Sequence, residues 1–150
     1  MTPGLWVAAG AVLVALVFGG YRAIADGRFR GTHRIRGAAP VEPAKETTWD
    51  QLAEAVGGAE LGERATLVQF STAFCAPCRV TRRVLADVAD GAPGVRHVEI
   101  DAEHHLDVVR RLGIVRTPTT VVLDATGQEV ARAAGAPRKD QVLSALSLEL

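Results

Sequence analysis

The stretch FSTAFCAPCRVTRRVL, residues 70–85, contains both cysteines of the 150-residue chain, Cys75 and Cys78. Only Ala76 and Pro77 separate them, and a basic run with helical spacing follows. Two thiols at this spacing can form a redox couple, half of a metal site or a local structural staple. The residues around the pair have to decide among these alternatives.

The composition is that of one compact domain with an appendage. Hydrophobic residues make up 48% of the chain, and 17 basic side chains balance 17 acidic ones. This balance gives no basic surplus for binding nucleic acid. A disulfide-stabilised mini-protein would need four or more cysteines, so stability has to come from a packed core.

An uncharged segment stands near the beginning of the sequence. Residues 2–21, TPGLWVAAGAVLVALVFGGY, contain no Asp, Glu, Lys or Arg. A helix of this length, rising about 1.5 Å per residue, would span the roughly 30 Å core of a bilayer. Trp6 and Tyr21 lie near its ends, as in the aromatic belts of membrane helices. We predict a transmembrane helix with its flank at 1–26; the alternatives are a buried soluble helix and a signal peptide cleaved after Ala25.

Positive charge gathers on one side of this segment. Five arginines follow it: Arg22, Arg28, Arg30, Arg34 and Arg36. The positive-inside rule then predicts a single-pass protein of the cell membrane with its domain in the cytoplasm; the extracytoplasmic side is the alternative. Residues 27–46 mix Gly, Pro and charge, which predicts a juxtamembrane linker that either lies against anionic headgroups or is a solvated tether.

From residue 47 to 150 the pattern is that of an α/β domain. Helices are expected at 48–56, from the residue after Cys75 to Gly91, at 105–114 and at 139–148, with Thr48 as the first N-cap. Strands are expected at 65–72, at 95–101 and on both sides of a turn at 125–127. We predict right-handed crossovers and a largely parallel sheet of four or five strands flanked by helices, in which the last strand alone is antiparallel.

The predicted position of Cys75 favours a reactive thiolate. It falls between a strand and the first turn of a helix, beside unpaired backbone N–H groups and the positive end of the helix dipole. Such positions lower thiol pKa values to about 3.5–7.5. Cys78 lies one turn further on, from where it can attack a mixed disulfide formed by Cys75. Pro77 suits an early helical position, because its missing N–H costs nothing there.

Other uses of the cysteine pair have less support. A structural zinc ion needs four ligands, and the remaining candidates, His97 and the adjacent His104 and His105, do not repeat the cysteine spacing. Haem attachment needs a histidine directly after Cys78, where the chain has arginine. An inert staple stays open, but a strand-to-helix junction favours exchange chemistry. We therefore expect no metal and no cofactor.

The chain resembles the thioredoxin family over residues 47 to about 148. AFCAPC, residues 73–78, is similar to the family's Trp-Cys-Gly-Pro-Cys, and RTPTTVVLD, residues 116–124, is similar to the loop in which a cis-proline precedes a strand. The resemblance implies that Cys75 attacks and Cys78 resolves, and that the substrate strand binds at Thr117, Pro118 and Phe74. It also implies protein thiols and disulfides as substrates, and a reductant such as a thioredoxin reductase or a membrane electron donor.

The sequence departs from the family pattern at several positions. Phe74 replaces the family's usual Trp and Ala76 its usual Gly, so substrate preference does not carry over. Gln69 and His97 stand where members often have a buried Asp and a Lys, and only the imidazole of this pair can act as a base. The family's first edge strand is not apparent, unless residues near Val41 supply it.

These observations predict a membrane-anchored thiol–disulfide oxidoreductase. The cytoplasm keeps thiols reduced, so a domain there would reduce protein disulfides through Cys75 and Cys78. The alternative is a non-catalytic module that holds a partner at the membrane through the groove at Thr117 and Pro118.

Overall fold

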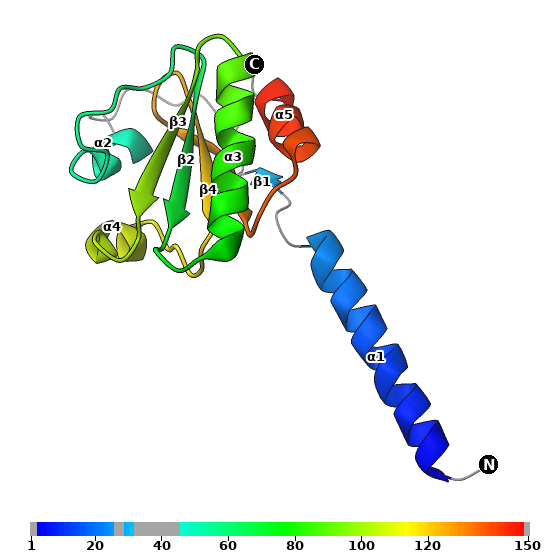
Figure 1. Ribbon diagram of the computed structural model, residues 1–150. Helices are drawn as coiled ribbons and strands as arrows, with labels where there is room; N and C mark the ends of the chain where they lie inside the picture. Colours follow the sequence, from blue (N-terminus) through cyan, green and yellow to red (C-terminus); the bar gives the residue numbers. More distant parts are fainter. Residues whose placement is uncertain (1–2, 26–28, 32–45, 149–150) are drawn as a thin grey trace, which may run out of the picture.

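The computed structural model describes residues 3–25, 29–31 and 46–148. The helices in these residues are α1 (Pro3–Ala25), α2 (Thr48–Leu52), α3 (Ala76–Gly91), α4 (Leu106–Arg111) and α5 (Lys139–Leu148). The strands are β1 (Phe29–Gly31), β2 (Ala65–Ser71), β3 (Val95–Asp101), β4 (Thr119–Asp124) and β5 (Glu129–Ala134). Figure 1 shows the central strands with α3 and α5 along one side of them.

The strands form one mixed sheet in the order β1-β5-β4-β2-β3. β2 and β3 are parallel, whereas the pairs β1–β5, β2–β4 and β4–β5 are antiparallel. The predicted α/β fold with a mixed sheet flanked by helices is therefore confirmed. The prediction of a largely parallel sheet is wrong, because the direction of β4 is reversed.

The length of the connection between β3 and β4 explains this reversal. α4 has six residues, which makes it about 9 Å long at 1.5 Å per residue. β3 has seven residues and spans about 23 Å. Such a short helix does not carry the chain back along the strand, and Figure 1 shows α4 near the carboxyl end of β3. β4 therefore begins at the end where β3 stops, and it runs antiparallel to β2.

Two apolar clusters pack the helices against the two faces of the sheet. The cluster under α3 and α5 includes Leu67, Leu85, Val88 and Val142. The cluster on the opposite face, under α2 and α4, includes Leu52, Phe70, Val108 and Val121. β2 is buried along its whole length because it lies inside the sheet with both faces covered. Because β2 is packed on both faces, its carboxyl end at Ser71, where the cysteine loop begins, is held in place.

The N-cap of α2 is Thr47, one residue before the predicted N-cap Thr48. The Thr47 hydroxyl accepts the backbone N–H of Asp50 at 3.1 Å, and the Asp50 carboxylate accepts the backbone N–H of Thr47 at 2.9 Å. This reciprocal capping box joins two residues three positions apart, Thr47 and Asp50. The helix also ends earlier than predicted, at Leu52, and the chain continues in turns.

β1 is a strand that the sequence analysis did not predict. Its residues lie within the predicted linker and pair antiparallel with β5, with Arg30 opposite Arg132. β1 therefore occupies the sheet edge for which a strand near Val41 was considered. Val41 and the rest of residues 32–45 lie outside the described residues.

α1 covers most of the uncharged N-terminal segment. In the part of the chain that the structure describes, no helix is long and apolar enough to cross a membrane. The structure therefore does not support the prediction of a transmembrane helix.

Candidate active site

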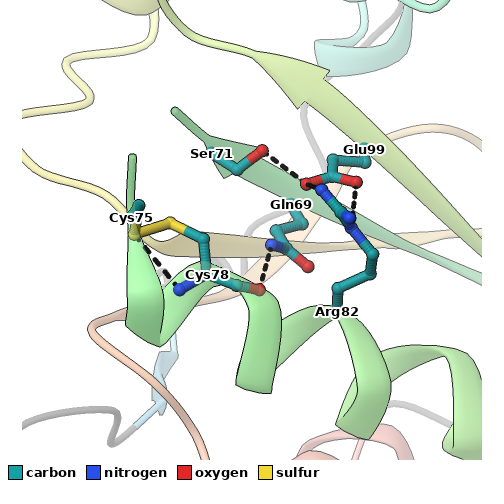
Figure 2. Close-up of polar contacts among 6 residues, drawn as sticks. All are labelled: Gln69, Ser71, Cys75, Cys78, Arg82 and Glu99. Carbon is teal, nitrogen blue, oxygen red and sulfur yellow. Dashed lines mark hydrogen bonds and ion pairs between the residues drawn. A yellow bond between two sulfur atoms is a disulfide. The ribbon is translucent and has the colours of Figure 1, made fainter. Parts of the chain in front are cut away.

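Cys75 and Cys78 form a disulfide at the start of α3, as Figure 2 shows. Their Cα atoms lie 5.2 Å apart. β2 ends at Ser71, a short loop follows, and Cys75 is the N-cap of α3. The predicted strand-to-helix position of Cys75 is confirmed.

The two sulfur atoms have different surroundings. The backbone N–H of Cys78 donates a hydrogen bond to Sγ of Cys75 at 3.1 Å. Cys75 is partly exposed, whereas only 1% of Cys78 is accessible to solvent. An N–H group at the first turn of a helix stabilises negative charge, so it favours a thiolate on Cys75 after reduction. The more exposed cysteine is thus also the one whose thiolate the backbone stabilises.

The predicted substrate-binding residues lie on the loops around Cys75. Phe74 directly precedes Cys75 and is 97% exposed. The peptide bond between Thr117 and Pro118 is cis. The hydroxyls of Thr72 and Thr117 lie 3.4 Å apart, and the backbone N–H of Cys75 donates to the Thr72 carbonyl. These contacts bring the proline loop beside the cysteine loop.

Gln69 is fully buried on β2, directly behind the first turn of α3. Its Nε2 donates a hydrogen bond to the carbonyl oxygen of Cys78 at 3.0 Å, as Figure 2 shows. Its Oε1 has no hydrogen-bond partner among the described residues. Because an amide does not titrate in the working range, this side chain positions the Cys78 backbone and does not exchange a proton.

His97 does not lie opposite Gln69 in the sheet; it lies two residues nearer the beginning of β3. In the parallel pair, Leu67 is opposite His97, and Gln69 is opposite Glu99. Burial lowers the pKa of His97; the charge of Glu99 opposes this effect and that of Arg82 adds to it. His97 lines a hollow with Ala86 and Asp90, away from the cysteines. The structure thus does not bring it to the disulfide, and its role as a base stays a prediction.

Glu99 is a residue beside the site that the sequence analysis missed. Its carboxylate accepts hydrogen bonds from Nη2 of Arg82 at 2.7 Å and from Oγ of Ser71 at 2.5 Å (Figure 2). Burial alone would raise the pKa of Glu99, but these hydrogen bonds and the charge of Arg82 outweigh it and hold the pKa below its ordinary value. The signal was present in the sequence, because Arg82 follows Cys78 by one helical turn and Glu99 follows His97 on the same face of β3.

A polar pocket of about 340 Å³ opens beside the disulfide. Both cysteines line it, together with the small side chains of Ser71, Thr72 and Ala73. The charged residues that line it are Arg79, Arg82, Glu99 and Asp101. Among the described residues, no three His, Cys, Asp or Glu side chains gather in a way that could hold a metal ion.

The fold and the site together define a class of protein. A mixed α/β sheet, a Cys-x-x-Cys disulfide at a strand-to-helix junction and a cis-proline loop beside it are the features of a thioredoxin-like exchange site. The family model described as "Thioredoxin-like domain" matches residues 52–148. The chain belongs to the thioredoxin-like family.

Curated relatives and solved structures agree with this assignment. A thioredoxin H-type from Fagopyrum esculentum is 32% identical over 82 residues, which are 55% of this chain and 69% of that protein. A thioredoxin from Mycoplasma genitalium is 28% identical over 81 residues, which are 54% of this chain and 78% of that protein. The structure of Fasciola hepatica thioredoxin shares the fold, with a TM-score of 0.54 at 21% identity over 70% of this chain and 96% of that one. The protein is a thiol–disulfide oxidoreductase.

Proposed function

We propose that this oxidoreductase reduces disulfides in proteins, with Cys75 as the attacking thiol and Cys78 as the resolving thiol. The observation that carries the proposal is the unequal environment of the two sulfurs. Cys75 is partly exposed and its Sγ accepts the N–H of Cys78, whereas Cys78 is 1% exposed. A substrate sulfur can reach the first but not the second.

The reaction begins with the reduced protein. The Cys75 thiolate attacks one sulfur of the substrate disulfide; a Cys75–substrate bond forms, the substrate S–S bond breaks, and the other substrate sulfur leaves and takes up a proton. Cys78 then loses its proton and attacks Sγ of Cys75, which releases the second substrate thiol. The protein ends with the Cys75–Cys78 disulfide, and two electrons have passed to the substrate.

The loops around Cys75 supply the contacts that a protein substrate needs. Phe74 offers an exposed apolar surface, and the Thr117–Pro118 loop offers a backbone edge for an extended substrate strand. A partner that donates two electrons has to return the disulfide to the dithiol. A thioredoxin reductase or a membrane electron donor fits this role.

Reduction of insulin disulfides by the protein, with an external dithiol as the reductant, tests this function. The wild type should catalyse the reduction, and Cys75→Ser should abolish it. Cys78→Ser should still attack but not resolve, so mixed disulfides with substrates should accumulate and be identifiable by mass spectrometry. Equal behaviour of the two variants would contradict the assigned roles.

We further propose that the N-terminal segment attaches the domain to the cell membrane, with the domain on the cytoplasmic side. The support lies in the sequence: residues 2–21 carry no charge, and arginines follow them. Described side chains of α1 such as Val7, Val14 and Leu16 are also more than half exposed, which leaves apolar surface for lipid to cover.

Cell fractionation and thiol labelling test this attachment. The full chain should remain in the membrane fraction after carbonate extraction, and a membrane-impermeant thiol reagent should not label reduced Cys75 in intact cells. Release by carbonate would exclude integral attachment. Labelling from outside would place the domain on the other side.

A further inference from the structure

The polar pocket beside the disulfide lies apart from the predicted protein-binding loops. Its charged lining comes from the first two turns of α3 and from the carboxyl end of β3, and neither Phe74 nor Pro118 belongs to it. Two arginines and two carboxylates give it a net charge of zero. The exchange reaction with a protein strand uses none of these four charges.

Two of the four charged side chains satisfy each other. Arg82 and Glu99 form an ion pair, and Ser71 donates the other hydrogen bond to that carboxylate. The charges of Arg82 and Glu99 therefore neutralise each other, and their contacts connect α3, β2 and β3. Neither side chain has a free charge with which to bind a ligand.

The other two side chains keep binding capacity. Within the described part of the chain, the side chain of Arg79 has no hydrogen bond or ion pair, so all donors of its guanidinium are open. Asp101 accepts one hydrogen bond at each carboxylate oxygen, from the backbone N–H of Glu103 and from Nδ1 of His104, both at 2.9 Å. Each oxygen retains a second lone pair. The pocket thus presents one free cation and one carboxylate with spare acceptors, next to Cys75.

We propose that this pocket binds small disulfides whose halves carry both a carboxylate and an ammonium group, as cystine does, and that the protein reduces them. The proposal rests on the exchange chemistry proposed above. Arg79 binds the carboxylate through charge-assisted hydrogen bonds, and Asp101 accepts from the ammonium group. The volume of about 340 Å³ lies at the small end of the range for ligand sites, which is about 300–1,000 Å³. It suits one half of such a disulfide, with the other half directed to solvent.

The reaction balances without a further reactant. The Cys75 thiolate attacks the sulfur of the half held in the pocket, and the outer half leaves as one cysteine after taking up a proton. Cys78 then attacks Sγ of Cys75, and the second cysteine is released. Two electrons and two protons pass from the two protein thiols to cystine, which becomes two molecules of cysteine.

Four small disulfides that differ only in charge test this binding. They are cystine, which carries both groups; cystamine, which carries ammonium groups; 3,3′-dithiodipropionate, which carries carboxylates; and neutral 2-hydroxyethyl disulfide. The full chain in detergent is reduced, freed of reductant and mixed with each disulfide, and the initial rate of thiol release is recorded. Each rate is divided by the rate of the same disulfide with dithiothreitol, which removes differences in leaving-group reactivity.

Cystine should have the highest normalised rate, about tenfold above the neutral disulfide. Arg79→Gln should lower the ratio of the cystine rate to the neutral rate about fivefold to tenfold, because the carboxylate loses its cation. Arg83→Gln is the matched control: Arg83 is exposed on the same helix, does not line the pocket, and its substitution should leave this ratio unchanged. The use of a ratio cancels any effect of Arg79 on the cysteines themselves.

Two outcomes would overturn the inference: a normalised cystine rate no higher than the neutral rate, or the same ratio in Arg79→Gln as in the wild type. Insulin is measured in parallel. If the protein reduces insulin and the neutral disulfide without preferring cystine, the pocket inference alone fails. If it reduces neither, the proposed function fails.

Discussion

The His97 side chain connects protonation to stability at the scale of single residues. Burial is the main cause of its lowered pKa in the folded protein, whereas the unfolded chain keeps the ordinary value of about 6.5. Below about pH 6.5 the unfolded state therefore binds a proton that the folded state does not. The free energy of unfolding is therefore not reduced by His97 above about pH 6.5, and it decreases as the pH falls below that value.

Urea unfolding between pH 8 and pH 5 measures this loss. Stability should fall toward pH 5 in the wild type, and His97→Gln should flatten the decrease between pH 7 and pH 5. His105→Gln, at the N-cap of α4, where its side chain makes no capping hydrogen bond, is the control. An equally steep decrease in His97→Gln would show that another group is responsible.

The Arg82–Glu99 pair predicts a dependence in the acid range. The pKa of Glu99 is lowered in the folded state despite its burial. The ionised carboxylate therefore contributes to the free energy of unfolding above the pKa of the unfolded chain, about 4.3. This contribution is lost as the pH falls through the pKa of the folded state. Arg82→Met should destabilise the protein by about 0.5–1 kcal/mol at pH 7, a modest amount because solvent screens the pair. The difference from the wild type should become smaller as the pH falls toward 3.

Urea unfolding at pH 7 and pH 3 checks this prediction. Arg83→Met, on the same helix but away from Glu99, should match the wild type at both values. If Arg82→Met lowers the free energy of unfolding by the same amount at pH 3 as at pH 7, the cause is lost packing of the arginine stem and not a lost ion pair.

The sequence predicted the cysteines of the site better than their polar neighbours. The strand pattern ends before Cys75, and Pro77 suits an early position of the helical run that follows. Both are local signals, so the N-cap position of Cys75 was predictable. The partner of Gln69 on the next strand depends on register, which a single sequence does not contain. The resemblance pointed to His97, whereas the register places Glu99 opposite Gln69.

At the scale of elements, the capping turn of α2 depends on a glycine in the β4–β5 turn. Gly127 has φ +82°, and a Cβ there would lie 2.7 Å from Cβ of Trp49 and 3.3 Å from Oγ1 of Thr47. The backbone N–H of Trp49 donates to the Gly127 carbonyl at 3.0 Å. α2 is therefore seated directly on this turn.

Gly127→Ala should destabilise the protein more than Gly57→Ala. Both positions have a positive φ, which costs a non-glycine residue roughly 1–2 kcal/mol. A Cβ at Gly57 would meet nothing within 4 Å, whereas at Gly127 the overlap should add about 1–3 kcal/mol. Urea unfolding of both variants separates the two costs, and equal losses would show that α2 moves aside without penalty.

The elements also show where sequence patterns stop being informative. The bounds of β3, α3 and α5 followed from local periodicity and from turn residues. The direction of β4 did not follow from these signals, because it depends on the end of the sheet at which α4 lies. β1 contains only Phe29, Arg30 and Gly31, a run too short for any periodicity, and it becomes a strand because β5 offers a free edge.

At the scale of the whole molecule, the strand order separates the N-terminal side of the domain from the pocket. β1 lies at one edge of the sheet and β3 at the other, four strand spacings away. At about 4.8 Å per spacing this is roughly 19 Å. A chain attached to a membrane ahead of β1 would therefore hold the β3 edge, which carries Glu99 and Asp101, away from its point of attachment.

The same strand order predicts that the N-terminal boundary of the stable domain lies before Phe29. β1 pairs with β5, and Phe29 is opposite Ala133, which is fully buried. Removal of residues 1–26 keeps this pairing, whereas removal of residues 1–45 deletes it and leaves the backbone of β5 unpaired at the sheet edge. Such edges lose stability and tend to pair with other chains.

We expect the shorter truncation to be soluble and more stable than the longer one by roughly 1–3 kcal/mol, from a few backbone hydrogen bonds at about 0.5–1.5 kcal/mol each. Urea unfolding measures the difference, and light scattering at rising concentration should show association of the longer truncation first. A further variant with Arg30→Pro in the shorter truncation tests the strand itself, because proline cannot donate to the ladder and so should remove part of the gain. If both truncations unfold at the same urea concentration, β1 contributes nothing to the fold, and the domain begins at Thr47.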